Sequence, residues 1–97
     1  MEIRVNNEEN RCVVTVIGRL DTNTAIELDD ALQSVGASEV LLSCSELEYV
    51  SSAGLRVILA AHKRLTTQGQ TLRLTGLRAE VRSVFEMTGF VRILNIE

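Results

Sequence analysis

Two adjacent serines, Ser51 and Ser52, have the clearest chemical potential in this sequence, because they precede Gly54 and open a long apolar stretch. The apolar spacing predicts a helix from about Ala53 to Thr67, which places both serines at its amino end. The first backbone N–H groups of a helix lack intrahelical partners, and the helix dipole adds partial positive charge there. A serine at this place can cap the helix, and it can also carry a phosphate, since the helix end stabilises anions. The residues alone leave both roles open.

Signals of catalysis and of metal binding are missing from the sequence. His62 is the only histidine, and it falls inside the predicted helix, where packing is its usual role. The sequence contains neither a cluster of residues with metal-ligand spacing nor a glycine-rich phosphate-binding motif. Cys12 and Cys44 lie in apolar runs and form no CxxC pair, which favours buried, reduced thiols. We therefore expect no enzyme, no metal and no cofactor.

Length and composition indicate one small globular domain over residues 1–97. Aromatic residues make up only 3% of the chain, so the core must be built from aliphatic side chains. The net charge of -3 does not suit a nucleic-acid backbone. Glu2 and Arg4 interrupt any signal peptide, and no apolar run approaches the ~20 residues of a membrane span. We expect a cytoplasmic protein that binds neither nucleic acid nor a membrane.

The apolar periodicity predicts an α/β fold with the order β-β-α-β-α-β-α-(β). The expected strands are Met1–Val5, Cys12–Ile17, Glu39–Cys44, Thr71–Leu74 and Val91–Ile96, and the expected helices are Thr24–Val35, Ala53–Thr67 and Ala79–Thr88. Thr24 and Glu27 match a capping box, and Gly18 is expected to end the second strand. The continuous run Val40–Leu42 predicts a strand buried on both faces. A hairpin followed by alternating helices and strands implies a mixed, mostly parallel sheet.

Three motifs stand in order along the chain. Glu48–Leu55 reads Glu-Tyr-Val-Ser-Ser-Ala-Gly-Leu, Gly18–Asp21 reads Gly-Arg-Leu-Asp, and Glu86–Phe90 reads Glu-Met-Thr-Gly-Phe. Together they resemble the signature helix start, the first-helix turn and the closing turn of the STAS family, the bacterial anti-sigma-factor antagonists. The resemblance covers nearly the whole chain. It implies a STAS-like α/β fold, a mixed central sheet of about four to five strands with three to four α-helices packed on it.

The resemblance also implies a function. In the family, the unphosphorylated antagonist binds an anti-sigma factor, a small serine kinase, and so frees the sigma factor. The kinase phosphorylates the signature serine and ends the interaction, and a serine phosphatase restores it. The family pattern assigns this phosphorylation to Ser52, with Ser51 as second choice. Ser43 and Ser51 stand where the family often has aspartate.

A polar face of the second predicted helix is the candidate partner surface. Arg56, Ala60, Lys63 and Thr67 recur at helical spacing away from the apolar side, although a merely solvated face would show the same pattern. The expected partner-binding residues are Asp21, Thr22, Ser51, Ser52, Ala53, Gly54, Arg56, Ala60 and Lys63. A side chain at Gly54 is expected to obstruct the kinase.

Two functions remain open from the sequence. One is the phosphorylation-switched antagonist, expected to be a monomer when free. The other keeps the STAS fold without a switch, as an adaptor in another signalling or transport complex.

Overall fold

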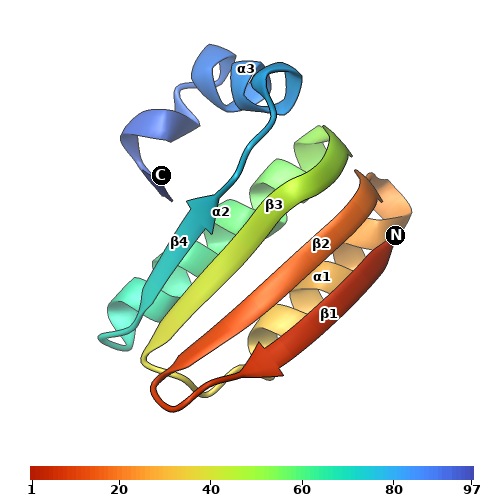
Figure 1. Ribbon diagram of the computed structural model, residues 1–97. Coiled ribbons are helices and arrows are strands. Elements are labelled where there is room, and N and C mark those ends of the chain that lie inside the picture. The colour runs from red at the N-terminus through yellow and green to blue at the C-terminus, as the bar shows by residue number, and fades with distance from the viewer.

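Five strands form one mixed sheet in the computed structural model, which describes residues 1–97 (Figure 1). The strands are β1 (Glu2–Asn7), β2 (Arg11–Leu20), β3 (Glu39–Val50), β4 (Thr71–Thr75) and β5 (Asn95–Ile96). Their order in space is the order in the chain, β1-β2-β3-β4-β5. Only β1 runs antiparallel to its neighbour, and the other pairs are parallel. The expected mixed sheet, opened by a hairpin, is confirmed.

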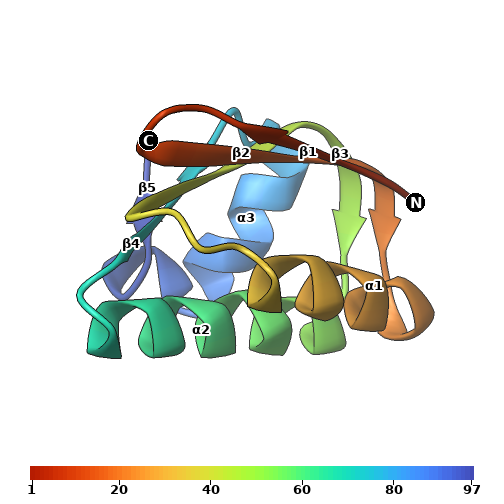
Figure 2. The ribbon, with the colours of Figure 1, turned by 90° about the horizontal axis from the view of Figure 1, so that it is seen from below.

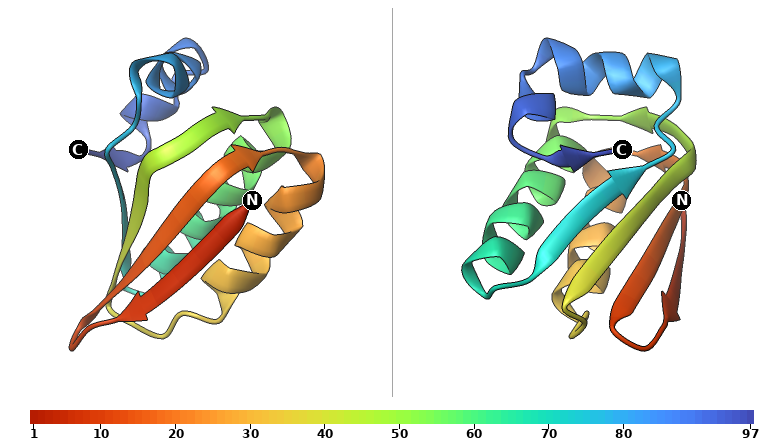
Figure 3. Two further views of the ribbon diagram at one scale, coloured as in Figure 1. Left: turned by 45° about the vertical axis from the view of Figure 1, so that its right-hand side comes forward. Right: turned by 60° about the vertical axis from the view of Figure 1, so that its left-hand side comes forward.

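Helices cover one face and one end of this sheet. They are α1 (Thr22–Gln33), α2 (Ser52–Thr67) and α3 (Ala79–Met87), followed by the short 3-10 helix η1 (Phe90–Arg92). Each parallel strand is added on the same side of the one before, so right-handed crossovers place α1 and α2 on a common face. Figure 2 shows both helices beneath the sheet. In Figure 3, α3 lies beyond the carboxyl ends of β3 and β4.

Alternating residues of the central strands build the core against α1 and α2. The buried strand residues include Cys12, Val14, Val16, Val40, Leu42, Leu72 and Leu74, and the buried helix residues include Leu28, Leu32, Leu55, Ile58 and Leu65. All are aliphatic or cysteine, as the composition required. The largest fully buried side chain is Phe85, which anchors α3. Leu41 is only half-buried because no helix covers its face, so the prediction of a strand buried on both faces was wrong.

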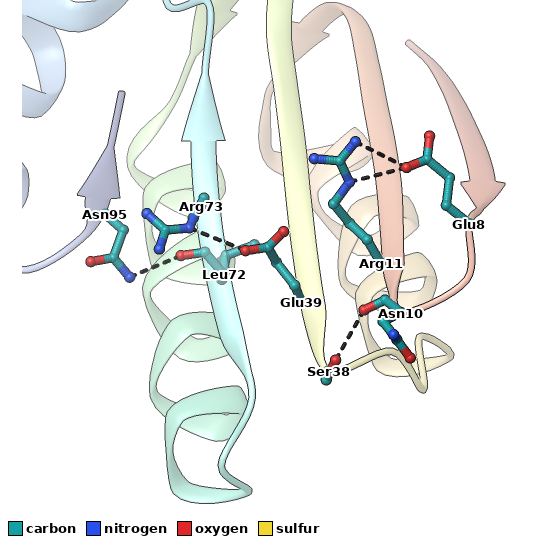
Figure 4. A network of polar contacts seen from close by, with 8 residues as sticks. All are labelled: Glu8, Asn10, Arg11, Ser38, Glu39, Leu72, Arg73 and Asn95. Carbon is teal, nitrogen blue, oxygen red and sulfur yellow. Dashed lines mark hydrogen bonds and ion pairs between the residues drawn. The ribbon is translucent and has the colours of Figure 1, made fainter.

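Polar contacts link the strands near the amino ends of β2, β3 and β4 (Figure 4). Arg11 closes the β1–β2 hairpin by pairing with Glu8 at 2.9 Å. Arg73 pairs with Glu39 across β3 and β4 at 3.3 Å. These partners are well exposed, and exposed pairs contribute little stability individually.

The strand β3 runs to Val50, whereas the sequence predicted its end at Cys44. Pairing with β2 continues because β3 carries two extra residues, one between Ser43 and Glu46 and the other at Glu48. Beyond Cys44 the buried residues recur every third position instead of every second. Strict alternation of buried and exposed residues therefore predicts too short a strand.

The bulges of β3 also affect β2 and α3. Pairing with the bulged part of β3 extends β2 to Leu20, and the first bulge provides a hydrogen-bond acceptor for the residue before α3. Gly18 does not end β2; it lies within the strand at φ +104°, next to one of the register shifts. Few residues other than glycine adopt this conformation. The carbonyl of Ser45, at the first bulge, accepts a 2.9 Å hydrogen bond from Arg78 Nε just before α3.

The start of α1 and the start of the last strand also differ from the prediction. The helix α1 begins at Thr22, and its capping box joins Asp21 to Thr24 rather than Thr24 to Glu27. The predicted capping box lay three residues too late in the chain. The pairs Asp21–Thr24 and Thr24–Glu27 have the same spacing, so spacing alone does not distinguish them. The last strand covers only Asn95–Ile96, since η1 occupies Phe90–Arg92. Gly69 and Gly89 follow α2 and α3 in the left-handed conformation that is common just after a helix end.

Both cysteines are buried and unpaired. Burial raises the pKa of the Cys44 thiol to about 12, and it also raises the pKa of Cys12. The reactive thiolate is therefore disfavoured at both positions.

We expect Cys44 to resist alkylation in the folded protein at about pH 8.5, and to react once the protein is unfolded in urea. Its folded pKa of about 12 lies above the reference value of 9.0. The stability that the neutral thiol contributes is thus fully present below pH 9.0 and is lost as the pH rises through the folded pKa. Urea unfolding of the wild type and of Cys44→Ala should show the steeper decline above pH 9.0 in the wild type. Rapid labelling of Cys44 without denaturant would contradict this picture.

Candidate functional site

The carboxyl ends of β2 and β3 bring two helix starts together. Leu20 and Val50 are paired at the ends of the strands, and the Ser51 amide donates a 2.8 Å hydrogen bond to the Leu20 carbonyl. The helix α1 begins two residues after Leu20, and α2 begins two residues after Val50. The side-by-side ends therefore bring Asp21 and Thr22 next to Ser51 and Ser52, as expected from the sequence.

Asp21 caps α1 with a fixed negative charge. Its Oδ1 accepts 3.0 Å hydrogen bonds from the amides of Asn23 and Thr24, and its own amide donates to Thr24 Oγ1 at 2.8 Å. The hydrogen bonds from Thr24, first from its amide and then from its hydroxyl, lower the pKa of the Asp21 carboxyl. Asp21 consequently stays ionised beside the start of α2.

The two serines have different environments. Ser51 is the N-cap of α2, and its Oγ accepts a 3.2 Å hydrogen bond from the Gly54 amide. Ser52 is the first residue of the helix, is exposed, and makes no side-chain hydrogen bond. The amides of Ser52 and Ala53 also lack acceptors within the protein, as is usual in a first turn. With no acidic residue in that turn, the helix start has a free hydroxyl beside free N–H groups.

Gly54 allows α2 to approach the end of β2 closely. A Cβ at this position would lie 2.6 Å from Leu20 Cγ and 3.2 Å from the Leu20 carbonyl oxygen. Both Gly54 and Leu20 are buried. The expectation that a side chain at Gly54 would obstruct an approaching kinase needs correction, because such a side chain would point into the core. Gly54 positions the serines from beneath and is not part of the exposed surface.

The polar face predicted on α2 is an exposed stripe. Arg56, Ala60, Lys63 and Thr67 are all exposed, whereas Leu55, Ile58, Ala61 and Leu65 are buried on the other side. From Arg56 to Thr67 the stripe extends about 16 Å along the helix. It continues directly from Ser52 at the helix start. The site is therefore one surface that runs from the ends of β2 and β3 along α2.

Sequence reasoning missed a cation–π pair beside this surface. The Arg19 guanidinium lies 4.2 Å from the ring centroid of Tyr49, and the two residues are register partners in β2 and β3. Tyr49 is 40% exposed although it is the only tyrosine of the chain. An exposed aromatic side chain held by an arginine is typical of contact surfaces. The signal was available, because Tyr49 lies within the Glu48–Leu55 motif.

Comparison with known proteins identifies the family. Residues 3–95 match the family model described as Mlab, STAS domain. The chain belongs to the STAS family. Both the recognition of this family and the expected α/β fold are thus confirmed. No helix of this STAS chain has the length and apolarity needed to cross a membrane.

Relatives of this STAS chain carry regulatory names. It is 31% identical to the anti-sigma-B factor antagonist of Listeria monocytogenes, over 87% of this chain and 76% of the relative. It is 26% identical to the anti-sigma F factor antagonist of Paenibacillus polymyxa, over 99% of this chain and 87% of the relative.

Solved structures share the fold at low identity. An anti-sigma factor antagonist from Mycobacterium paratuberculosis superimposes with a TM-score of 0.87 at 22% identity, over 98% of this chain and 83% of the other. The Bacillus cell fate determinant SpoIIAA in its phosphorylated form gives 0.77 at 14% identity, over 99% and 91%.

We expect Gly54→Ala to lower the free energy of unfolding by about 1–3 kcal/mol, because the new methyl group overpacks against the buried Leu20 side chain. The Leu20 carbonyl, 3.2 Å from the added carbon, limits how far the helix can adjust. Urea unfolding followed by circular dichroism measures the change.

Gly36→Ala is the matched control, since a Cβ there meets nothing within 4 Å. Its effect should be neutral or slightly stabilising. Equal stability of the two variants would show that the close approach at Gly54 is unimportant.

Proposed function

We propose that this chain is an anti-sigma-factor antagonist that binds a serine-kinase anti-sigma factor and is released when that kinase phosphorylates Ser52. The names of the relatives support an antagonist. The existence of SpoIIAA in a phosphorylated form supports a phosphorylation switch on this fold. We further propose that residues 1–97 act as a single cytoplasmic domain by binding, without catalysis, and that a serine phosphatase resets the switch.

The observation that supports Ser52 over Ser51 is the different use of their hydroxyl groups. Ser51 Oγ is engaged as the cap of α2, accepting from the Gly54 amide. Ser52 is exposed and its hydroxyl has no partner. A kinase must reach the hydroxyl and replace its proton with a phosphoryl group. Transfer to Ser52 meets no obstacle of this kind, whereas transfer to Ser51 would compete with the cap.

A phosphate at Ser52 should be tolerated by the fold. It adds about -1.5 to -2 charges and three acceptor oxygens. The unpartnered amides of Ser52 and Ala53 and the dipole of the 16-residue helix stabilise an anion there. Asp21, ionised beside the same helix start, repels it in part. The local balance favours little change in the domain.

The same phosphate should be incompatible with a packed interface. Binding would remove it from water, and an unpaired charge is expensive to desolvate. The proposed interface comprises the start of α2, the stripe Arg56–Thr67 and the Asp21–Thr22 edge. Ser52 lies between the edge and the stripe, so a partner covering both must cover Ser52. Phosphorylation would therefore break the contact without unfolding the protein.

Phosphorylation at Ser52 can be tested with the candidate kinase, ATP and mass spectrometry. We expect phosphate on the wild type and on Ser51→Ala, and none on Ser52→Ala. Ser52→Asp should fold normally and bind the kinase at least about 100-fold more weakly, a loss of about 3 kcal/mol. Ser52→Ala should bind and resist inactivation.

Phosphate found only at Ser51 would overturn the assignment to Ser52. If the genuine partner binds but adds no phosphate, the protein would instead be an unswitched STAS adaptor.

The proposed stripe can be tested by charge reversal. Arg56→Glu with Lys63→Glu should weaken binding to the anti-sigma factor by at least about tenfold, since both cations lie at the proposed centre of contact. Binding is measured by calorimetry, and folding is checked by circular dichroism. Arg82→Glu with Arg92→Glu makes the same change of charge on α3 and η1, and it should have a much smaller effect. Equal losses in the two double variants would place the interface elsewhere.

A further inference from the structure

The outer edge of β1 is an unpaired strand that has neither proline, lysine nor a bulge. It is the first strand in the sheet order, and it pairs with β2 through six consecutive residue pairs without a bulge. Natural proteins usually protect such edges with proline, bulges, lysine or very short strands. The other edge strand, β5, has only two residues, whereas β1 has six and contains no proline. The edge of β1 is thus able to pair with another strand.

The outward-facing backbone groups of β1 belong to its odd-numbered residues. The Glu8 amide donates to the Arg11 carbonyl at 2.7 Å. Because antiparallel partners alternate between bonded and non-bonded pairs, the even-numbered residues of β1 direct their N–H and C=O groups toward β2. The N–H and C=O groups of Ile3 and Val5 therefore point away from the sheet.

One antiparallel register makes β1 complementary to itself. If Ile3 faces Ile3 of a second copy, Glu2 of each chain faces Arg4 of the other, and Met1 faces Val5. The odd-numbered residues then meet as hydrogen-bonded pairs, in agreement with their outward groups. Opposite charges on facing strands attract. A register centred on Arg4 would oppose two arginines, and one centred on Val5 would oppose Glu2 to Glu8.

We propose that a second copy of this chain docks along β1 in the register centred on Ile3, which joins two five-stranded sheets into one. This proposal differs from the sequence-based expectation of a monomer. The interface is separate from the surface at the start of α2 and does not depend on the proposed switch.

An apolar groove beneath β1 supports this occupant. The groove is lined by Met1, Ile3, Val5, Glu27 and Ala31, between the strand and α1. Val5 is 48% exposed, which is high for a valine in a strand. In the proposed register, Met1, Ile3 and Val5 of one copy lie against the same three residues of the other. Docking would thus cover the apolar side chains that one chain leaves exposed.

Glu2 and Arg4 form a row of opposite charges on the other side of β1, here called the charge row. These side chains can also pair with those of a second copy. Arg4 Nε lies 2.6 Å from Glu2 Oε2 in the same chain, with both side chains more than half exposed. In the dimer each of these four charges gains an opposite neighbour from the second copy. The alternating row therefore favours the register centred on Ile3.

Sedimentation equilibrium over a range of concentrations tests the proposal. The wild type should approach twice its 10.7 kDa mass as the concentration rises toward about 1 mM. Glu2→Arg and Arg4→Glu should each weaken self-association at least about tenfold, because like charges then face each other. An equimolar mixture of these two variants should form a heterodimer, since the two cations on the charge row of one chain then face the two anions on the row of the other.

Glu80→Arg on α3 is the control for charge alone and should associate like the wild type. In the wild type, hydrogen exchange at the Ile3 and Val5 amides should slow with concentration, while exchange at Arg4 should not change. A wild type that stays monomeric at about 1 mM, or single variants that associate as tightly as the wild type, would overturn the proposal. So would a mixture that forms no heterodimer, because the register would then be wrong.

Discussion

One backbone hydrogen bond, from the Ser51 amide to the Leu20 carbonyl, ties the end of β3 to the end of β2 at 2.8 Å. Two helices begin immediately beyond this bond, so it determines how their first turns lie relative to each other. Next to this bond, Gly54 lets α2 come close to Leu20, because an added Cβ would lie 2.6 Å from Leu20 Cγ. The exposed residues of the site depend on this alignment, although none of them makes the bond.

The alignment sets two helix caps of unlike charge side by side. Asp21 caps α1 with a carboxylate whose pKa is lowered by Thr24. Ser51 caps α2 with a neutral hydroxyl, at a position where the STAS family often has aspartate. A neutral cap leaves the positive end of the α2 dipole uncompensated beside Ser52. The departure from the family pattern therefore reduces the repulsion that a nearby anion would meet.

The sequence predicted the order of the elements well, because helix and strand periods are distinct in this chain. It identified the start of α2 within one residue, since a serine cap, a glycine and an apolar stripe coincide there. It failed where local pairing departs from regular geometry. The bulges of β3 change the spacing of its buried residues. Serine and glutamate are common in regular strands and loops alike, so Ser45 and Glu48 do not predict a bulge.

The candidate site was predictable in part for the same reason. Helical spacing was sufficient to place Arg56 and Lys63 on an exposed face. The different roles of Ser51 and Ser52 required atomic positions, because either serine could have been the cap. The buried contact of Gly54 with Leu20 joins residues more than thirty positions apart, and no local pattern reports such a contact.

The parallel pairing of the central strands also constrains how the chain can fold. Val14 faces Leu42, and Leu42 faces Leu74, so each central pair closes a loop of about thirty residues. A loop of that length costs conformational entropy before its contacts form. When the crossover helices form early, they reduce this entropy cost, because they bring the following strand back to the sheet. The chain contains no proline, so peptide-bond isomerisation adds no slow step to its refolding. Formation of these non-local parallel pairs is then the slow step that the topology predicts.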